Sequence, residues 1–121
     1  MARYGIDVWI TGHQHFYERS RPMRYGVPTE LGSDSYVDPL GTVLVITGGG
    51  GQSLYSFASE TLFWPWSAAH AKRYHYVLFE VQGTTLTATA IDTGLGGGDT
   101  FDAFSLTRTG PPPTLPGLPL R

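Results

Sequence analysis

The sequence predicts a mostly β fold, or an α+β fold in which strands dominate, with largely antiparallel strand pairs. Sixteen glycines and nine prolines in 121 residues interrupt the chain too often for long helices. Between these breaks lie short runs rich in β-branched and aromatic residues, which are typical of strands. Apolar and polar residues also alternate over residues 74–81 and 84–91, which indicates a hairpin near the C-terminus.

The composition excludes several classes of protein. Charged residues make up 15% of the chain and the formal net charge is −2, so bulk charge predicts no nucleic-acid partner. The lack of cysteine excludes disulfides and thiolate ligands, and a bound metal would therefore need nitrogen and oxygen ligands. No apolar stretch approaches the roughly 18 residues of a membrane-spanning helix, so we expect no membrane partner. These observations leave the cellular compartment unknown.

One stretch near the start carries the clearest candidate site. Ile6–Thr11 is a short apolar run, and we expect it to form a strand buried on both faces. Gly12 ends the run and allows a close backbone approach. His13 and His15 follow with one residue between them, and in extended geometry both imidazoles would point to the same side. Imidazole binds zinc, iron, manganese or copper, so these histidines are candidate metal ligands, with ordinary hydrogen-bonded histidines as the alternative.

The residues around this stretch are less distinctive. Residues 1–5 are typical of the end of a helix that closes at Gly5. Residues 17–23 fit a strand or an extended loop, in which Glu18 and Arg19 form a local ion pair; a phosphate contact by Arg19 is the alternative. Residues 23–40 are rich in Gly, Pro, Ser and Asp, and we expect a long surface loop.

The middle of the chain begins with its clearest buried strand, Gly41–Thr47, which runs into four glycines. We reject a phosphate loop, because no Lys-Ser/Thr pair follows and no G-x-G-x-x-G pattern opens a helix. A tight turn with positive φ and close backbone packing is the better explanation. Residues 67–73 fit a short helix, and His70 and His75 are expected to be structural or surface histidines. Most aromatic residues of this part should cover a sheet face, with sugar or base stacking as the alternative: Tyr55, Phe57, Phe63, Trp64 and Trp66.

The C-terminal part predicts three more strands. Tyr74–Val81 alternates and places His75, Val77, Phe79 and Val81 on one face. Gln82 and Gly83 form the expected two-residue turn to Thr84–Ile91. Thr100–Thr107 is the last expected strand. Residues 109–121 hold most of the prolines, and we expect a disordered tail there.

Gly12-His13-Gln14-His15 followed by Tyr17-Glu18-Arg19 resembles the last metal-binding motif of calcineurin-like metallophosphoesterases, in the purple acid phosphatase branch. The later order of elements is similar to that branch as well, so the resemblance covers about residues 4–108. It implies an αββα sandwich with two metal ions, iron with zinc, manganese or a second iron. By position, His13 would hold the second metal and His15 the first. The implied activity is hydrolysis of a phosphate ester substrate.

The sequence also departs from that family. The earlier Asp-x-His or Asp-x-Gly, Gly-Asp-x-x-Asp/Tyr and Gly-Asn-His motifs do not occur, and neither does a further upstream histidine. Two histidines cannot fill two coordination spheres. We therefore interpret residues 1–108 as the C-terminal part of an incomplete metallophosphoesterase domain. The other ligands and the general acid would come from an upstream part that is missing here or that lies on another chain. We assign no catalytic residue, and the substrate-binding residues remain unknown. The alternative is a non-catalytic β-rich module that binds carbohydrate or peptide and has a structural His-x-His.

Overall fold

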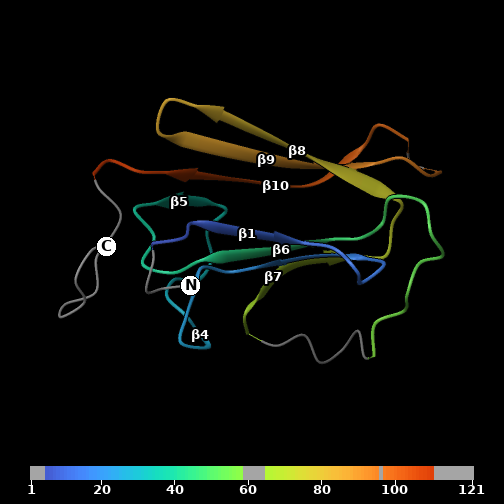
Figure 1. The fold of residues 1–121 in the computed structure, drawn as a ribbon, viewed down its shortest axis with the longest axis horizontal. Helices are drawn as coiled ribbons and strands as arrows, with labels where there is room; N and C mark the ends of the chain where they lie inside the picture. Colours follow the sequence, from blue (N-terminus) through green and yellow to red (C-terminus); the bar gives the residue numbers. More distant parts are fainter. Residues whose placement is uncertain (1–4, 59–64, 96, 111–121) are drawn as a thin grey trace.

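The chain folds into two four-stranded sheets that lie face to face, as the two layers of ribbons in Figure 1 show. The computed structural model describes residues 5–58, 65–95 and 97–110, and within these ranges every regular element is a strand. The predicted mostly β fold is therefore confirmed. A helix end was expected at residues 1–5, but residues 1–4 lie outside the described ranges. Residues 111–121 of the expected tail also lie outside them. The described part contains no helix that could span a membrane.

The first sheet has the strand order β1-β6-β2-β7. Its strands are β1 (Val8–Thr11), β6 (Val43–Thr47), β2 (Tyr17–Ser20) and β7 (Ser67–Ala71). β1 and β6 are parallel, whereas β2 runs antiparallel to both β6 and β7. Because parallel strands end at the same edge of a sheet, the segments that follow β1 and β6 leave the sheet side by side, on the right in Figure 1.

Two expectations for this sheet are wrong. β1 forms where a strand is predicted but is not buried on both faces, because it is an edge strand in which Trp9 is 45% exposed and Ile10 51% exposed. A short apolar run reveals a strand but not its place in a sheet. The helix expected at residues 67–73 is instead β7, which pairs with β2. The pairing with an available strand outweighs the helix propensity of Ala68 and Ala69.

The second sheet has the order β5-β10-β9-β8. β8 (His75–Gln82), β9 (Thr85–Asp92) and β10 (Thr100–Thr107) form an antiparallel meander, and β5 (Ser35–Val37) lies parallel to β10. The expected hairpin is confirmed, but its two-residue turn lies one residue later than predicted, because Gln82 pairs directly with Thr85. Gly83 has a φ of +61°, which suits the first position of a type II′ turn.

The expected loop at residues 23–40 contains more structure than its composition predicts. β3 (Met23–Arg24) and β4 (Val27–Pro28) form a small hairpin, and β5 follows. Tyr36 in β5 is only 1% exposed and belongs to the core. A strand of three residues offers too short a pattern to be recognised among glycines and prolines.

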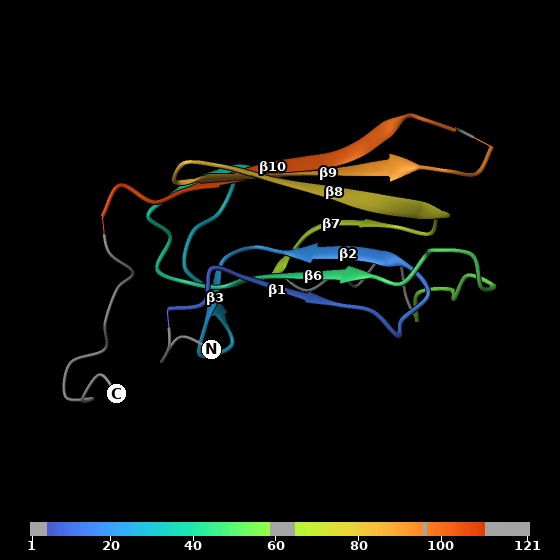
Figure 2. The same ribbon diagram turned by 45° about the horizontal axis from the view of Figure 1, so that its top comes forward.

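The core lies between the two layers, which Figure 2 shows in a turned view. Both sheets contribute buried apolar side chains because successive residues of each strand alternate between the two faces. A β-bulge between Thr100 and Asp102 lets Phe101 also contact this core. The buried apolar residues of this core are Tyr17, Val43 and Val45 from the first sheet and Tyr36, Ala88, Ala90, Phe104 and Leu106 from the second.

Candidate metal centre

The two candidate ligands lie in a pair of tight turns that directly follow β1. The Gln14 amide donates to the Gly12 carbonyl at 2.9 Å, and the Phe16 amide donates to the Gln14 carbonyl at 2.8 Å. Each bond spans three residues, so His13 and His15 are the central residues of two consecutive γ-turns. The extended geometry that we assumed for these histidines is therefore wrong. His13 has a φ of +71°, which is the left-handed region that a residue with a side chain seldom adopts.

His15 is held by the segment that follows the glycines. The Nδ1 atom of His15 lies 2.8 Å from the carbonyl oxygen of Ser53. The Tyr55 amide donates to the carbonyl oxygen of His15 at 2.9 Å. The rings of His15 and Tyr55 stack with centroids 4.1 Å apart and planes 14° from parallel. Since a carbonyl can only accept, Nδ1 carries the proton of the neutral imidazole. Nε2 is then the nitrogen with a free lone pair, and this is the arrangement that prepares a histidine for metal binding.

Two of the four glycines after β6, Gly48 and Gly49, are needed because other segments lie against them. A Cβ atom on Gly48 would collide with the carbonyl of Gln14, and one on Gly49 would collide with the His75 ring and lie 2.6 Å from the Arg73 carbonyl oxygen. The Gly48 amide also donates to the Phe16 carbonyl at 3.2 Å. The predicted close backbone packing is confirmed. Of these four glycines only Gly51 has a positive φ, so a left-handed turn is not their common requirement.

His75 is a buried structural histidine, as predicted. Its Nδ1 lies 2.7 Å from the Arg73 carbonyl and its Nε2 lies 3.0 Å from the Thr47 hydroxyl, so both ring nitrogens have partners. Nδ1 must donate to the carbonyl, and Nε2 therefore accepts from Thr47 in the neutral ring. His70 is exposed, with its ring edge-on to Phe57 at 5.2 Å.

The other predicted aromatic residues do not share one role. Tyr55 is 43% exposed and stacks on His15 rather than covering a sheet face. Phe57 is half-buried and contacts Phe16 with ring centroids 4.8 Å apart, and Trp66 is also half-buried. Phe63 and Trp64 lie outside the described residues.

The Tyr-Glu-Arg segment that follows the turns joins the two sheets. The Tyr17 hydroxyl donates to Asp102 Oδ2 at 2.6 Å. The Arg19 Nε donates to the same oxygen at 2.7 Å, and an Arg19 terminal nitrogen donates to Asp102 Oδ1 at 2.9 Å. The expected ion pair between Glu18 and Arg19 is therefore wrong, since these neighbours on a strand point to opposite faces. Arg19 is 1% exposed, and this burial also argues against a phosphate contact.

The other hydrogen-bond acceptors of Arg19 lie in β5 and in the residue before it. Arg19 donates to the Tyr36 hydroxyl at 2.8 Å and to Asp34 at 2.7 Å. Burial and the hydrogen bond to Asp102 raise the pKa of Tyr17. Burial acts to lower the pKa of Arg19, but the hydrogen bond and charge of Asp102 outweigh it and raise this pKa. Sequence reasoning missed Asp102 because it lies 83 residues from Arg19 and follows no local pattern.

The candidate ligands are both accessible, since His13 is exposed and His15 is half-buried. Within the described ranges, no three or more His, Asp or Glu side chains lie close enough together to hold a metal ion. The described residues therefore do not form a complete metal centre by themselves, and His13 and His15 stay candidate ligands.

Known proteins resemble this chain in both sequence and structure. No family model matches it. The acid phosphatase type 7 of Homo sapiens is 35% identical over 86 residues, which cover 69% of this chain and 19% of that protein. A probable inactive purple acid phosphatase 1 of Arabidopsis thaliana is 38% identical over 63 residues, which cover 51% of this chain and 10% of that protein.

The solved structure of a purple acid phosphatase from yellow lupin (Lupinus luteus) seeds matches with a TM-score of 0.79 and 29% identity, and the match covers 88% of this chain. The chain belongs to the purple acid phosphatase family. The match spans 18% of the lupin phosphatase chain. The resemblance inferred from the Gly-His-Gln-His and Tyr-Glu-Arg residues is thus confirmed, and purple acid phosphatases are binuclear metal enzymes.

Proposed function

We propose that this chain supplies His13 and His15 to the binuclear metal centre of a phosphoric ester hydrolase of the acid phosphatase or phosphodiesterase type. The observation that carries the proposal is the hydrogen bond from His15 Nδ1 to the Ser53 carbonyl, which leaves Nε2 as the free ligand nitrogen. By resemblance, His15 holds the first metal, and His13 holds the second.

The backbone of His13 supports the same proposal. A left-handed φ on a residue with a side chain costs about 1–2 kcal/mol, and such strain gathers at functional sites. Glycine at this position would remove that cost. The His13 side chain is exposed, so burial in the core does not offset the cost. Metal binding by the imidazole explains why a histidine stands at this position.

The small number of candidate ligands among the described residues supports a centre that is completed by another part of the protein. Each metal of a binuclear site needs about four to six ligands, and the described chain offers two imidazoles. We therefore expect a preceding part of the same domain to bring the remaining ligands and the general acid, with residues 1–108 as the C-terminal part of that domain and residues 109–121 as its tail. When bound, two ions of the iron, zinc or manganese type activate water and stabilise the charge that develops on a phosphate ester.

Activity is the direct test of this proposal. The 121-residue chain, incubated with p-nitrophenyl phosphate and iron, zinc or manganese salts, should release nitrophenol no faster than the salts alone. A protein extended by the in-frame DNA upstream of Met1 should hydrolyse it, and His13→Ala or His15→Ala should abolish most of that activity, whereas His70→Ala should not. Full activity of the extended His13→Ala, His15→Ala double variant would contradict the proposal. Quenching of Trp64 and Trp66 fluorescence by sugars without any metal effect would instead favour a carbohydrate-binding module.

A further inference from the structure

The carboxylate of Asp102 in β10 accepts three hydrogen bonds from β2, a strand of the opposite sheet. The donors are the Tyr17 hydroxyl and two nitrogens of Arg19, at 2.6, 2.7 and 2.9 Å. The Asp102 side chain is 8% exposed, so water competes little for these bonds. Tyr17 and Arg19 are two residues apart and therefore point to the same face of β2, toward the second sheet.

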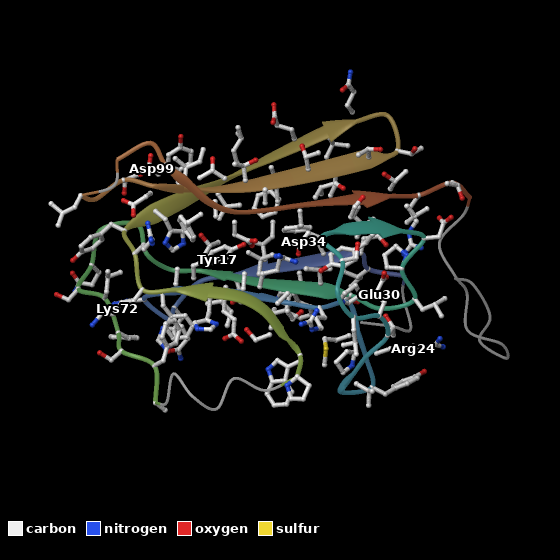
Figure 3. The ribbon with its side chains drawn as sticks, turned by 180° about the vertical axis from the view of Figure 1, so that it is seen from behind. Tyr17, Arg24, Glu30, Asp34, Lys72 and Asp99 are labelled. Atoms are coloured by element: carbon white, nitrogen blue, oxygen red, sulfur yellow. The ribbon has the colours of Figure 1, made fainter. Side chains whose placement is uncertain are left out.

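Tyr17 is also the point at which β2 begins, directly after the turn centred on His15. Figure 3 shows its side chain between the two sheets. Its ring lies edge-on to the His75 ring at 5.4 Å and to the Phe101 ring at 5.2 Å. The His75 ring also lies against Gly49. The neighbouring Gly48 contacts the Gln14 carbonyl, which belongs to the pair of turns at residues 12–16, here called the histidine turn. The end of the turn is thus fixed through Tyr17 to groups of the second sheet.

We propose that Asp102 is a positioning residue for the metal centre, which holds the exit of the histidine turn in place through Tyr17 and Arg19. Asp102 contacts no candidate ligand itself. It contributes by fixing the start of β2, because a buried carboxylate bonded to three donors on one strand leaves that strand little freedom to shift. The second sheet then determines where the His15 ring lies, although it supplies no ligand.

This inference rests on the proposed function, because a metal centre is what Asp102 would position. The effect of Asp102 on the histidine turn can nevertheless be measured without metal. The test uses the whole 121-residue chain and NMR cross-peaks between the stacked rings of His15 and Tyr55. Tyr17→Phe removes one hydrogen bond to Asp102, and Asp102→Asn removes the charge. Asp7→Asn is the matched control, since it weakens the ion pair with Arg108 at the opposite end of β1 from the turn.

In the metal-free chain, we expect Tyr17→Phe to weaken these cross-peaks and Asp102→Asn to weaken them further. Asp7→Asn should leave them unchanged, and dispersed signals from β8 and β9 should show that every variant is folded. Unchanged ring contacts in both Tyr17→Phe and Asp102→Asn would overturn the inference. If Asp102→Asn does not fold, Tyr17→Phe decides alone, because it keeps the ion pair with Arg19.

Binding of Co²⁺, followed by its visible absorption, provides the second measurement. We expect both variants to bind Co²⁺ about 10-fold or more weakly, the size of effect seen for groups that orient ligands. If the unsubstituted chain binds Co²⁺ too weakly to measure, the ring contacts alone decide whether Asp102 positions the turn, and the activity of the extended protein decides the proposed function. If the chain binds Co²⁺ and both variants bind it equally well, the positioning role is overturned and the proposed function stands.

Discussion

A Cβ atom on Gly48 would collide with the carbonyl group of Gln14, whose carbon atom lies 2.8 Å from the Cβ position. The peptide between His13 and His15 therefore rests directly on the backbone at the end of β6. This contact joins the two segments that leave the parallel strands β1 and β6 at the same edge. The position of the histidine turn thus depends on a residue that carries no side chain.

Gly48→Ala should disturb this contact. The turn and the end of β6 are both backbone, so neither can move aside without cost, and we expect the free energy of unfolding to fall by about 1–3 kcal/mol. Gly50→Ala is the control: no atom lies within 4 Å of its Cβ position, and its effect should stay within about 0.5 kcal/mol. Urea unfolding measures the free energy of unfolding of both variants. Equal losses in the two would show that the contact between Gly48 and Gln14 does not exclude a methyl group.

His13→Gly should make the chain more stable while removing a proposed ligand. Glycine adopts the φ of +71° without steric cost, so we expect a gain of about 1 kcal/mol in the free energy of unfolding. Gln14→Gly, at a neighbour without a positive φ, should instead cost about 0.5–1 kcal/mol. Thermal and urea unfolding compare the two substitutions. A loss of stability in both would mean that His13 is not strained.

Arg19→Leu should be among the most damaging single substitutions. It leaves Asp102 buried without its cationic partner, and such a change costs about 3–5 kcal/mol. Arg24→Leu is the matched control, because Arg24 only covers the exposed Tyr25 ring at 5.3 Å and should contribute no more than about 1 kcal/mol. Similar losses for both arginines, measured by urea unfolding, would refute the importance assigned to the buried pair.

Stability should fall in alkali because of Tyr17. Burial and Asp102 raise the pKa of this phenol above its ordinary value of 10.0, so the folded chain keeps a proton that the unfolded chain loses. The stabilisation is complete below pH 10 and decreases by about 1.4 kcal/mol per pH unit above it. Burial also raises the pKa of Tyr36, which adds to the loss.

Tyr17→Phe isolates the contribution of Tyr17 to this loss. The free energy of unfolding of this variant, measured between pH 9.5 and 11.5, should fall less steeply than that of the unsubstituted chain. Parallel curves for the two proteins would contradict the assignment.

Local patterns predicted those parts of the molecule that local forces determine. The alternation over residues 74–81 and 84–91 identified two strands and the hairpin that they form. The Gly-His-Gln-His sequence marked the candidate ligands, and the glycines after β6 indicated a close backbone approach. Each of these features needs only neighbouring residues to be recognised.

Features that depend on distant partners were not predictable in this way. Asp102 meets Arg19 across 83 residues, and the strand at residues 67–71 forms because β2 lies beside it. Extended geometry at His13 was a poor assumption, because nothing in the local residue types indicates that the chain turns sharply there. Long-range pairing and local strain are the physical reasons why the site differs from its sequence-based description.

A Zn²⁺ titration of the 121-residue chain, followed through the NMR signals of its four histidine rings, tests the central claim most directly. We predict that the His13 and His15 signals shift together, with the larger change at Nε2 of His15, while the buried His75 signals stay in place. The His13→Ala, His15→Ala double variant should lose this binding. Zn²⁺ binding that leaves the His13 and His15 signals unchanged, or that persists at equal affinity in the double variant, would contradict the account.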